Sequence, residues 1–369
     1  MPTFTKARAG SLLLLIALTL PLFAGCDSNG GSSGLNTEVT VMTRNVYLGA
    51  DLFSLLDPSC ADAAILVCVA QLYGTVVASD VHARMAAIAA EIEATNPDLV
   101  GLQEVTTYYS QVPGDHHIPG SETQATNVTF DFLEILMDEL DARGLNYNIA
   151  AENMNADVEF PSTVDGVNFI DYRLMDRDVI LARNDVTVSN VLENNFDAAI
   201  TAVIPIGGVD ITFTRGFSHL TAMKDGVSFT FANAHLEVGG EAVGAQILQG
   251  AVLKGALSNL TSPVIAVGDF NSDPSDPGDD GSVYRNFLDD YTDAWANSQG
   301  TSTPGNTCCQ DDLHATPSQL DSRIDIIFYR GDADATSTDV VGENEADMTG
   351  SGVWPSDHAG VVATITVRN

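Results

Sequence analysis

Apolar residues are spaced in two ways along the chain, and each spacing predicts a different element. Between residues 81 and 92 they return every three or four positions, which is typical of a helix with one buried face. Residues 128–143 and 242–260 predict further helices. Residues 48–78 and 108–127 show no clear period, so we expect an irregular insertion and a loop there.

Short apolar or alternating runs predict strands between these helices. The runs cover residues 38–42, 99–102, 178–182, 211–217, 227–234, 264–267, 324–329 and 361–367. Strands therefore outnumber helices, and the helices fall between groups of strands. This order predicts an α+β fold in which two sheets pack on each other and carry helices outside.

The N-terminus has a composition of its own. Lys6 and Arg8 precede an almost unbroken apolar run over residues 11–23. The run is too short for a membrane-spanning helix, which needs about 20 apolar residues. A positive segment followed by such a run is typical of a signal peptide, and we expect residues 1–25 to be one.

The apolar run ends in Leu-Phe-Ala-Gly-Cys, which resembles the bacterial lipobox, whose Cys is acylated and becomes the new N-terminus. We expect Cys26 to carry a lipid anchor in a membrane of the cell envelope, on the periplasmic or outer surface. Ordinary secretion with cleavage near Ala24 is the alternative. The polar residues 26–36 predict a flexible tether, and residues 37–369 predict one large domain.

The chain is strongly acidic, with 50 acidic and 15 basic residues and a formal net charge of −35. Signal-peptide removal would take away Lys6 and Arg8 and leave the protein more acidic still. Such a surface lacks the basic footprint that non-specific binding to nucleic acid needs. Adaptation to a saline habitat is favoured over an acidic partner-binding role.

The remaining cysteines form two close pairs in the sequence. Cys60 and Cys68 can close a small disulfide loop in an oxidising compartment. Cys308 and Cys309 are adjacent, and a disulfide between neighbours is strained, so free thiols and separate pairing are both open. The cysteine spacing does not suggest a structural zinc site.

Polar residues that can bind a metal or move protons lie at or near the ends of predicted strands. They are Asn45, Glu104, His235, Asp269, Asn271, Asp357 and His358. Groups on rigid strand ends suit a preorganised site. Each alone is weak evidence, because a strand-terminal Asp is often a turn residue and a lone His is more often structural.

The motifs around these residues together resemble the endonuclease/exonuclease/phosphatase superfamily, whose fold is that of deoxyribonuclease I. They are Thr43-Arg44-Asn45, Leu102-Gln103-Glu104-Val105, Ala234-His235-Leu236, Gly268-Asp269-Phe270-Asn271-Ser272-Asp273, Arg323-Ile324-Asp325 and Ser356-Asp357-His358. The resemblance implies a four-layer α/β/β/α sandwich of two mostly antiparallel sheets with outer helices. It also implies that residues 37–369 are a metal-dependent phosphoric ester hydrolase.

The resemblance assigns a metal site. Glu104 is expected to be the main ligand of Mg²⁺, or of Mn²⁺, because a carboxylate is a hard ligand for a hard ion. Asn45 and Asp357 resemble the residues that complete or orient this site through oxygen or water. Mg²⁺ keeps several waters, so few protein ligands are expected.

The resemblance also assigns catalytic roles. Asp269 resembles the carboxylate that activates or orients the attacking water, and Asn271 the residue that holds a phosphate oxygen or that carboxylate. His358 is expected to bind the phosphoryl oxygen or to act as acid or base, with Asp325 on its other ring nitrogen. His235 is expected to donate to the phosphate or the leaving group.

Arginines flank several of these residues. Arg177 could fill the phosphate-binding position of deoxyribonuclease I, although a surface ion pair explains it equally well. With Arg44 and Arg323 it predicts a local positive pocket in an acidic shell, which can focus an anionic substrate. A long basic groove is not predicted, so small phosphoesters are as well supported as duplex DNA.

An acidic loop follows the Asp269 motif and could hold a structural Ca²⁺. An EF-hand would need Gly and Glu where the chain has Pro274 and Asp280. Asp273, Asp276, Asp279 and Asp280 could still form an irregular Ca²⁺ site, but a solvated acidic turn is favoured.

The sequence thus predicts a secreted, lipid-anchored monomer that acts as a phosphodiesterase or nuclease with a metal-activated water. A phosphomonoesterase or a sphingomyelinase-type phospholipase on the same fold is the first alternative. A long apolar docking hairpin and the inositol phosphatase motif GDxNYR are both missing from the sequence, which mildly disfavours lipid and inositol substrates. A non-catalytic surface-binding lipoprotein is disfavoured because both histidines and all the candidate acids are present.

Overall fold

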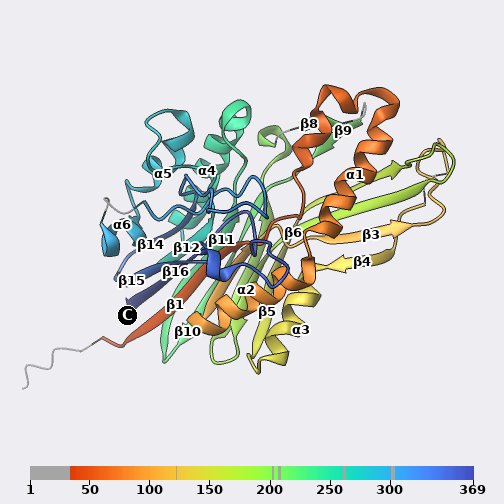
Figure 1. The fold of residues 1–369 in the computed structure, drawn as a ribbon. Coiled ribbons are helices and arrows are strands. Elements are labelled where there is room, and N and C mark those ends of the chain that lie inside the picture. Colours follow the sequence, from red (N-terminus) through yellow and green to blue (C-terminus); the bar gives the residue numbers. More distant parts are fainter. Residues whose placement is uncertain (1–33, 122, 202, 207–208, 261–262, 301–303) are drawn as a thin grey trace, which may run out of the picture. The chain divides into compact units, whose positions relative to one another are not determined.

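The strands of the computed structural model form two large sheets and one small one (Figure 1). The structure describes residues 34–369 except positions 122, 202, 207–208, 261–262 and 301–303. The expected signal peptide and Cys26 therefore lie outside the described residues, as does most of the expected tether. Residues 35–369 form one unit, in which the first strand begins at Asn36.

The eight-stranded sheet has the order β15-β16-β1-β2-β6-β3-β4, with β5 paired to β6. Its strands are β1 (Asn36–Asn45), β2 (Leu99–Gln103), β3 (Thr107–Gln111), β4 (Asn127–Asp131), β5 (Tyr147–Ser162), β6 (Ile170–Arg183), β15 (Ala333–Val341) and β16 (Gly360–Arg368). β1 pairs in parallel with β2 and antiparallel with β16, so the first and last strands are neighbours.

The six-stranded sheet has the order β13-β14-β12-β11-β10-β7. Its strands are β7 (Thr187–Asn195), β10 (Gly216–Lys224), β11 (Val227–His235), β12 (Val264–Asp269), β13 (Thr292–Asp293) and β14 (Asp325–Arg330). β11 and β12 are parallel, and β12 and β14 are antiparallel. A separate hairpin joins β8 (Val203–Ile206) and β9 (Val209–Thr212).

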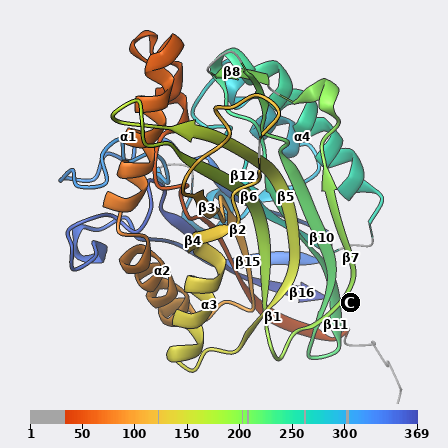
Figure 2. The ribbon, with the colours of Figure 1, turned by 90° about the vertical axis from the view of Figure 1, so that its right-hand side faces the viewer.

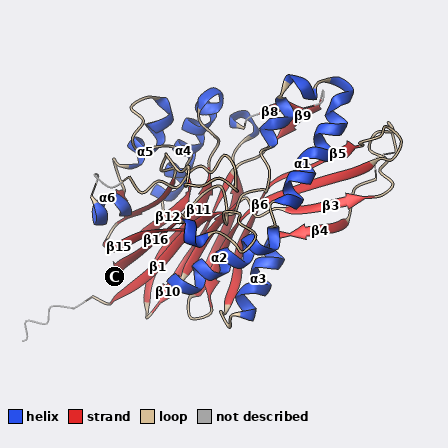
Figure 3. Cartoon of the chain, in the orientation of Figure 1, coloured by secondary structure: helices blue, strands red, loops and turns tan. Residues whose placement is uncertain are grey.

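Helices cover the outer face of each sheet (Figures 2 and 3). They are α1 (Ile65–Ala78), α2 (Val81–Thr95) and α3 (Phe132–Ala142) on the larger sheet, and α4 (Val243–Ser258) and α5 (Ser282–Phe287) on the smaller; the short α6 (Ala294–Gln299) contacts β14 and β15. β6 shows why the layers form. Val179 and Leu181 pack with the helices, while Ile180 and Ala182 pack between the sheets, because successive side chains of a strand point to opposite faces. The predicted α+β four-layer sandwich is confirmed.

The segment predicted to be irregular contains a helix. Residues 52–64 form short 3₁₀ turns, η1 (Leu52–Leu56), η2 (Pro58–Cys60) and η3 (Asp62–Ala64), and α1 follows directly. Almost every residue of α1 is apolar, so a helical period is not visible in its sequence. The Cys60–Cys68 disulfide joins η2 to α1.

Two further predictions were wrong at their edges. Residues 127–131 are strand β4 and not the first turn of a helix, and α3 begins after Asp131, whose side chain accepts the backbone N–H groups of Leu133 and Glu134. The expected loop from residue 108 begins within strand β3. Among the residues that the structure describes, no single helix is both long enough and apolar enough to cross a membrane. Residues 62–95, which include α1 and α2, have the required length and apolarity together, but the two helices are bent relative to each other.

Candidate active site

Strand ends from both sheets meet around a pocket of about 340 Å³. The sequence-predicted residues that line it are Glu104, His235, Asp269, Asn271, Asp357 and His358. Their meeting follows from strand register: Asn45 is paired with Gln103 beside Glu104, His235 with Asp269, and Asp269 with Asp325. Asn45 and Asp325 do not line the pocket but hold residues that do.

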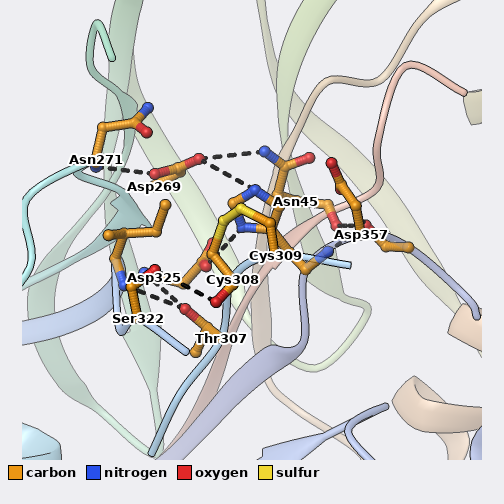
Figure 4. Close-up of a disulfide and its surroundings, with 12 residues drawn as sticks. Asn45, Asp269, Asn271, Thr307, Cys308, Cys309, Ser322, Asp325 and Asp357 are labelled. Atoms are coloured by element: carbon orange, nitrogen blue, oxygen red, sulfur yellow. Dashed lines mark hydrogen bonds and ion pairs between the residues drawn. A yellow bond between two sulfur atoms is a disulfide. The ribbon is translucent and has the colours of Figure 1, made fainter. Parts of the chain in front are cut away.

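Asn45 connects the two sheets beneath the pocket. Its amide nitrogen donates to Glu104 Oε1 at 3.1 Å and to Asp269 Oδ2 at 3.2 Å. The backbone N–H of Asn271 donates to the other oxygen of Asp269 at 2.9 Å, and Figure 4 shows Asp269 held from both sides. Fully buried Asn45 therefore fixes the separation of two carboxylates that come from different sheets.

The backbone is strained at the site. Glu104, Asn271 and Tyr47 have φ angles of 60°, 49° and 62°, in the left-handed region that residues with a side chain rarely adopt. Each such residue costs about 1–3 kcal/mol and persists only where surrounding structure enforces it. The backbone N–H of Leu48 donates to Glu104 Oε2 at 2.9 Å, so both carboxylate oxygens are held.

His358 is oriented by a buried acid. Its Nδ1 lies 2.8 Å from Asp325 Oδ2, and its Nε2 lies 3.9 Å from Asp269 Oδ2 on the pocket side. Burial opposes protonation of the imidazole, but Asp325, Asp357 and Asp269 outweigh it and raise the pKa of His358 well above its usual value. The ring is therefore set to be an imidazolium that points Nε2 at the pocket.

His235 lies between charges of both signs. Arg215 Nη1 is 3.0 Å and 3.1 Å from the two ring nitrogens, and Asp178 and Asp269 carboxylate oxygens lie at 3.6 Å and 3.5 Å. Burial and Arg215 disfavour the protonated ring, but Asp178 and Asp269 outweigh them and raise the pKa of His235. His235 and the permanent positive charge of Arg215 therefore lie side by side next to Asp269.

The carboxylates of the pocket are crowded enough to disfavour their own charges. Burial, together with the like charge of Glu104, raises the pKa of Asp357 to about 7. Burial and the like charges of Asp178 and Glu104 raise the pKa of Asp176 to about 7. Both carboxylate oxygens of buried Asp178 lack a hydrogen-bond partner. A divalent cation beside Glu104 would offset this repulsion, so the donor set fits a hard metal ion.

Glu104 differs from these neighbours. Burial disfavours its charge, but the cationic groups of His235, His358 and Arg215 outweigh burial and lower its pKa. An ionised carboxylate with both oxygens positioned is the strongest metal-ligand candidate of the set.

A pair of cysteines borders the same pocket. Cys308 and Cys309 are joined by a disulfide, an arrangement that the sequence had disfavoured, and both line the pocket (Figure 4). The surrounding segment is hydrogen-bonded to the loop before β16 and to the start of β14. Gln310 N donates to Asp357 O at 2.8 Å, and the N–H of Asp325 donates to Thr307 Oγ1 at 3.2 Å. This segment braces the Asp325–His358 pair.

Arg177 does not lie at the site. It ion-pairs with Asp131 at 2.6 Å and with Glu152 at 3.3 Å, and it is not among the pocket-lining residues. Its neighbours Asp176 and Asp178 point toward the site, because a one-residue step along β6 reverses the direction of the side chain. The expected phosphate-binding role of Arg177 is therefore corrected.

The expected positive pocket is built differently. Arg44 is buried against Glu91 and Arg323 against Asp293, so neither lines the pocket. The arginine that does line it is Arg215, which lies just before β10 and had no motif around it in the sequence. The predicted strand began only at residue 178, whereas β6 begins at Ile170. A strand that includes residues 176–178 places Asp176 and Asp178 on one face, which could have indicated both acids.

The acidic loop after Asp269 uses its carboxylates locally. Asp273, Asp276 and Asp280 accept backbone N–H groups of Ser275, Gly278 and Gly240. Among the residues that the structure describes, the metal-capable His, Cys and acid clusters do not include this loop. The structure favours the solvated turn over the Ca²⁺ site.

Comparison with known proteins identifies the family. The sequence matches the Endonuclease/Exonuclease/phosphatase family over residues 74–358. The chain belongs to this family. Membership makes it a phosphoric ester hydrolase, and enzymes of this family generally depend on a divalent metal.

Solved structures support the family fold. Family proteins from Bacteroides thetaiotaomicron (17% identity, TM-score 0.52, covering 90% of this chain and 99% of that one) and Leptotrichia buccalis (15%, 0.51, 89% and 99%) are similar. One from Beutenbergia cavernae has 19% identity and a TM-score of 0.52, covering 89% of this chain and 72% of that one. At these identities the likeness shows the fold alone. Curated proteins gave no match.

Proposed function

We propose that this hydrolase is a secreted, lipid-anchored phosphodiesterase that depends on Mg²⁺ or Mn²⁺. The observation that carries the proposal is the single pocket in which Glu104, Asp269 and His358 converge from different strands. The N-terminal signal and Cys26 support the envelope location, on the periplasmic or outer surface. The acidic surface supports a small or exposed phosphoester over a long duplex.

Glu104 would hold the metal ion, with Asn45 orienting it and Asp357 completing the shell. A bound ion supplies charge neutralisation of the phosphoryl oxygens and a lowered pKa of bound water. The chain itself fixes Glu104 through the Asn45 amide and the Leu48 N–H. The position of Glu104, the proposed ligand, is therefore fixed before an ion binds.

Asp269 orients the attacking water. Its carboxylate is held by Asn45 and by the backbone of Asn271, which leaves the group rigid beside the pocket. Protonated His358, aligned by Asp325, donates Nε2–H to a phosphoryl oxygen, and His235 offers a second donor to the phosphate or the leaving group. Charge that develops in the transition state is thus met by preorganised donors.

The first test is hydrolysis of bis-p-nitrophenyl phosphate with Mg²⁺ or Mn²⁺, and its loss in EDTA. Glu104→Gln should lower kcat by at least about 100-fold and should weaken Mn²⁺ binding measured by calorimetry, because the amide removes a charged ligand. Glu134→Gln, on the exposed side of α3, is the matched control and should behave as wild type. Undiminished Mn²⁺ binding by Glu104→Gln would remove Glu104 from the metal site.

A further inference from the structure

One side of the catalytic pocket is apolar. Leu52 and Phe53 of η1, Ile204 and Ile206 of β8, and Phe213 line it, and we refer to these five residues as the apolar wall. Metal binding and phosphate transfer do not use such side chains. Apolar groups that face a pocket gain free energy when an apolar ligand covers them. The apolar wall is therefore suited to contact the part of the substrate that lies beyond the phosphate.

A second, smaller cavity of about 40 Å³ borders the wall. Leu52, Ile206 and Phe213 line both spaces. Apart from Arg173, which is paired with Asp157, every residue lining the small cavity is apolar or aromatic. An apolar cavity of this kind is poorly hydrated and gains by accepting an apolar group.

Part of the wall lies before the matched family sequence, and the rest lies within it. The family match begins at residue 74, whereas Leu52, Phe53 and the cavity residue Val69 come before it. Ile204 and Ile206 belong to the separate β8–β9 hairpin. The disulfide between Cys60 and Cys68 braces the segment that follows Leu52 and Phe53. A disulfide-braced apolar segment that lines the catalytic pocket points to selection of a substrate group.

The charges around the pocket restrict that group. Asp51, Glu237 and Asp311 line the pocket with the catalytic acids, and the whole chain carries −35. A long polyanionic strand along this rim would be repelled, whereas an uncharged apolar group would not. The pocket volume of about 340 Å³ fits a small organic phosphate.

We propose that the substrate is a phosphodiester with an apolar ester group, which packs on the apolar wall at Leu52, Ile206 and Phe213 and extends toward the second cavity. This inference rests on the proposed phosphodiesterase function and names the class of substrate for it. The apolar group is a short alkyl or aryl ester of a small molecule, or the first part of a lipid chain.

The test is a series of alkyl p-nitrophenyl phosphates, from methyl to hexadecyl, in which the leaving group stays constant. kcat/KM should rise about threefold to fourfold for each of the first methylenes, as expected for burial of CH₂ groups. A plateau at hexyl would identify small esters as the source of the group, and a continued rise to hexadecyl would identify a lipid. A flat series would overturn the proposal.

A pair of variants on one helix localises the effect. Val69→Phe fills the second cavity and should reduce the advantage of hexyl over methyl at least fivefold while methyl hydrolysis stays within twofold of wild type. Val67→Phe, two positions away and 38% exposed, is the control and should keep the full series. If Val69→Phe fails to fold, Leu52→Asn on the pocket rim tests the same loss. An unchanged series in the folded variant would overturn the assignment.

A binding measurement separates this inference from the proposed function. Methyl- and hexylphosphonate are not hydrolysed, and calorimetry should show tighter binding of hexylphosphonate by at least tenfold. If hexylphosphonate binds more tightly but no phosphodiester is hydrolysed, the proposed phosphodiesterase function is wrong and the apolar subsite is supported. If phosphodiesters are hydrolysed but both phosphonates bind equally, the apolar subsite is wrong and the phosphodiesterase function is supported.

Discussion

Two regions of one pocket are built by opposite rules. The catalytic floor consists of Glu104, His235, Asp269 and His358, which line the pocket, and of Asn45 beneath them. It is polar, and all of it is buried except Glu104, which is partly buried. The apolar wall lies on a 3₁₀ turn, a small hairpin and the residue that follows it, and it offers only apolar surface. The family match spans the floor except Asn45, and it spans the wall except Leu52 and Phe53.

This difference indicates that the floor determines the reaction and the wall determines substrate selectivity. Charges on the floor need exact partners, because an unpaired buried charge costs several kcal/mol. The wall needs only shape and burial, so it can change among relatives without disturbing the chemistry. We therefore expect variants of the floor to affect all substrates equally and variants of the wall to affect them selectively.

The largest expected effect comes from the floor. His358→Ala removes the imidazolium and should lower kcat about 1000-fold for every alkyl ester in the series. Its thermal unfolding midpoint should fall, because buried Asp325 loses its partner, but the variant should remain folded at the assay temperature. The exposed His314 gives the matched control, and His314→Ala should retain full activity. A loss that grows or shrinks with chain length would break the separation of floor and wall.

The next-largest effect concerns the charge of Asp176, which lines the pocket beside the floor. In the folded protein the pKa of Asp176 is raised to about 7 from an ordinary value of 3.8. Between these values the unfolded chain has released this proton and the folded chain has kept it, so the free energy of unfolding falls as the pH rises from about 4 to 7. Asp176→Asn should lose this part of the pH dependence.

Urea unfolding in EDTA buffers at pH 4, 5.5 and 7 measures the effect of Asp176→Asn without bound cations. The variant should gain stability relative to wild type as the pH rises. Asp289→Asn, whose carboxylate is largely exposed, should follow wild type at every pH. A constant difference between Asp176→Asn and wild type from pH 4 to 7 would contradict the raised pKa.

The smallest effect should come from the disulfide that braces the segment after Leu52 and Phe53 of the wall. Replacing Cys60 and Cys68 with Ser opens a short loop and should reduce stability of this segment by about 2 kcal/mol. Hydrogen exchange should increase within residues 52–78, and hydrolysis of the methyl ester should remain within twofold. Equal loss of methyl and hexyl hydrolysis would show that this segment supports the floor as well.

The sequence predicted the floor better than the wall for a physical reason. Asn45, Glu104 and Asp269 follow apolar runs, and strand register alone brings such ends together. Arg177 was misplaced by one residue, because a strand reverses its face at each step and the sequence did not show which face was inward. Arg215 carried no motif, since its role depends on which strands meet.

The wall could not be predicted because its signal is tertiary. α1 is apolar on nearly every side, so neither its helical period nor its buried face is visible in the sequence. Phe213 and Leu52 lie far apart in the chain and meet only through the fold. Apolar residues are common in every core, so their function as a pocket wall depends on space that remains after packing.

The pairing of β1 with β16 has a consequence for biosynthesis. Asn45 and β1 are synthesised well before His358 and β16. Until then β1 lacks one partner and the pocket lacks its imidazolium. We therefore expect a growing chain to hydrolyse phosphoesters only after His358 has been made and β16 has paired with β1.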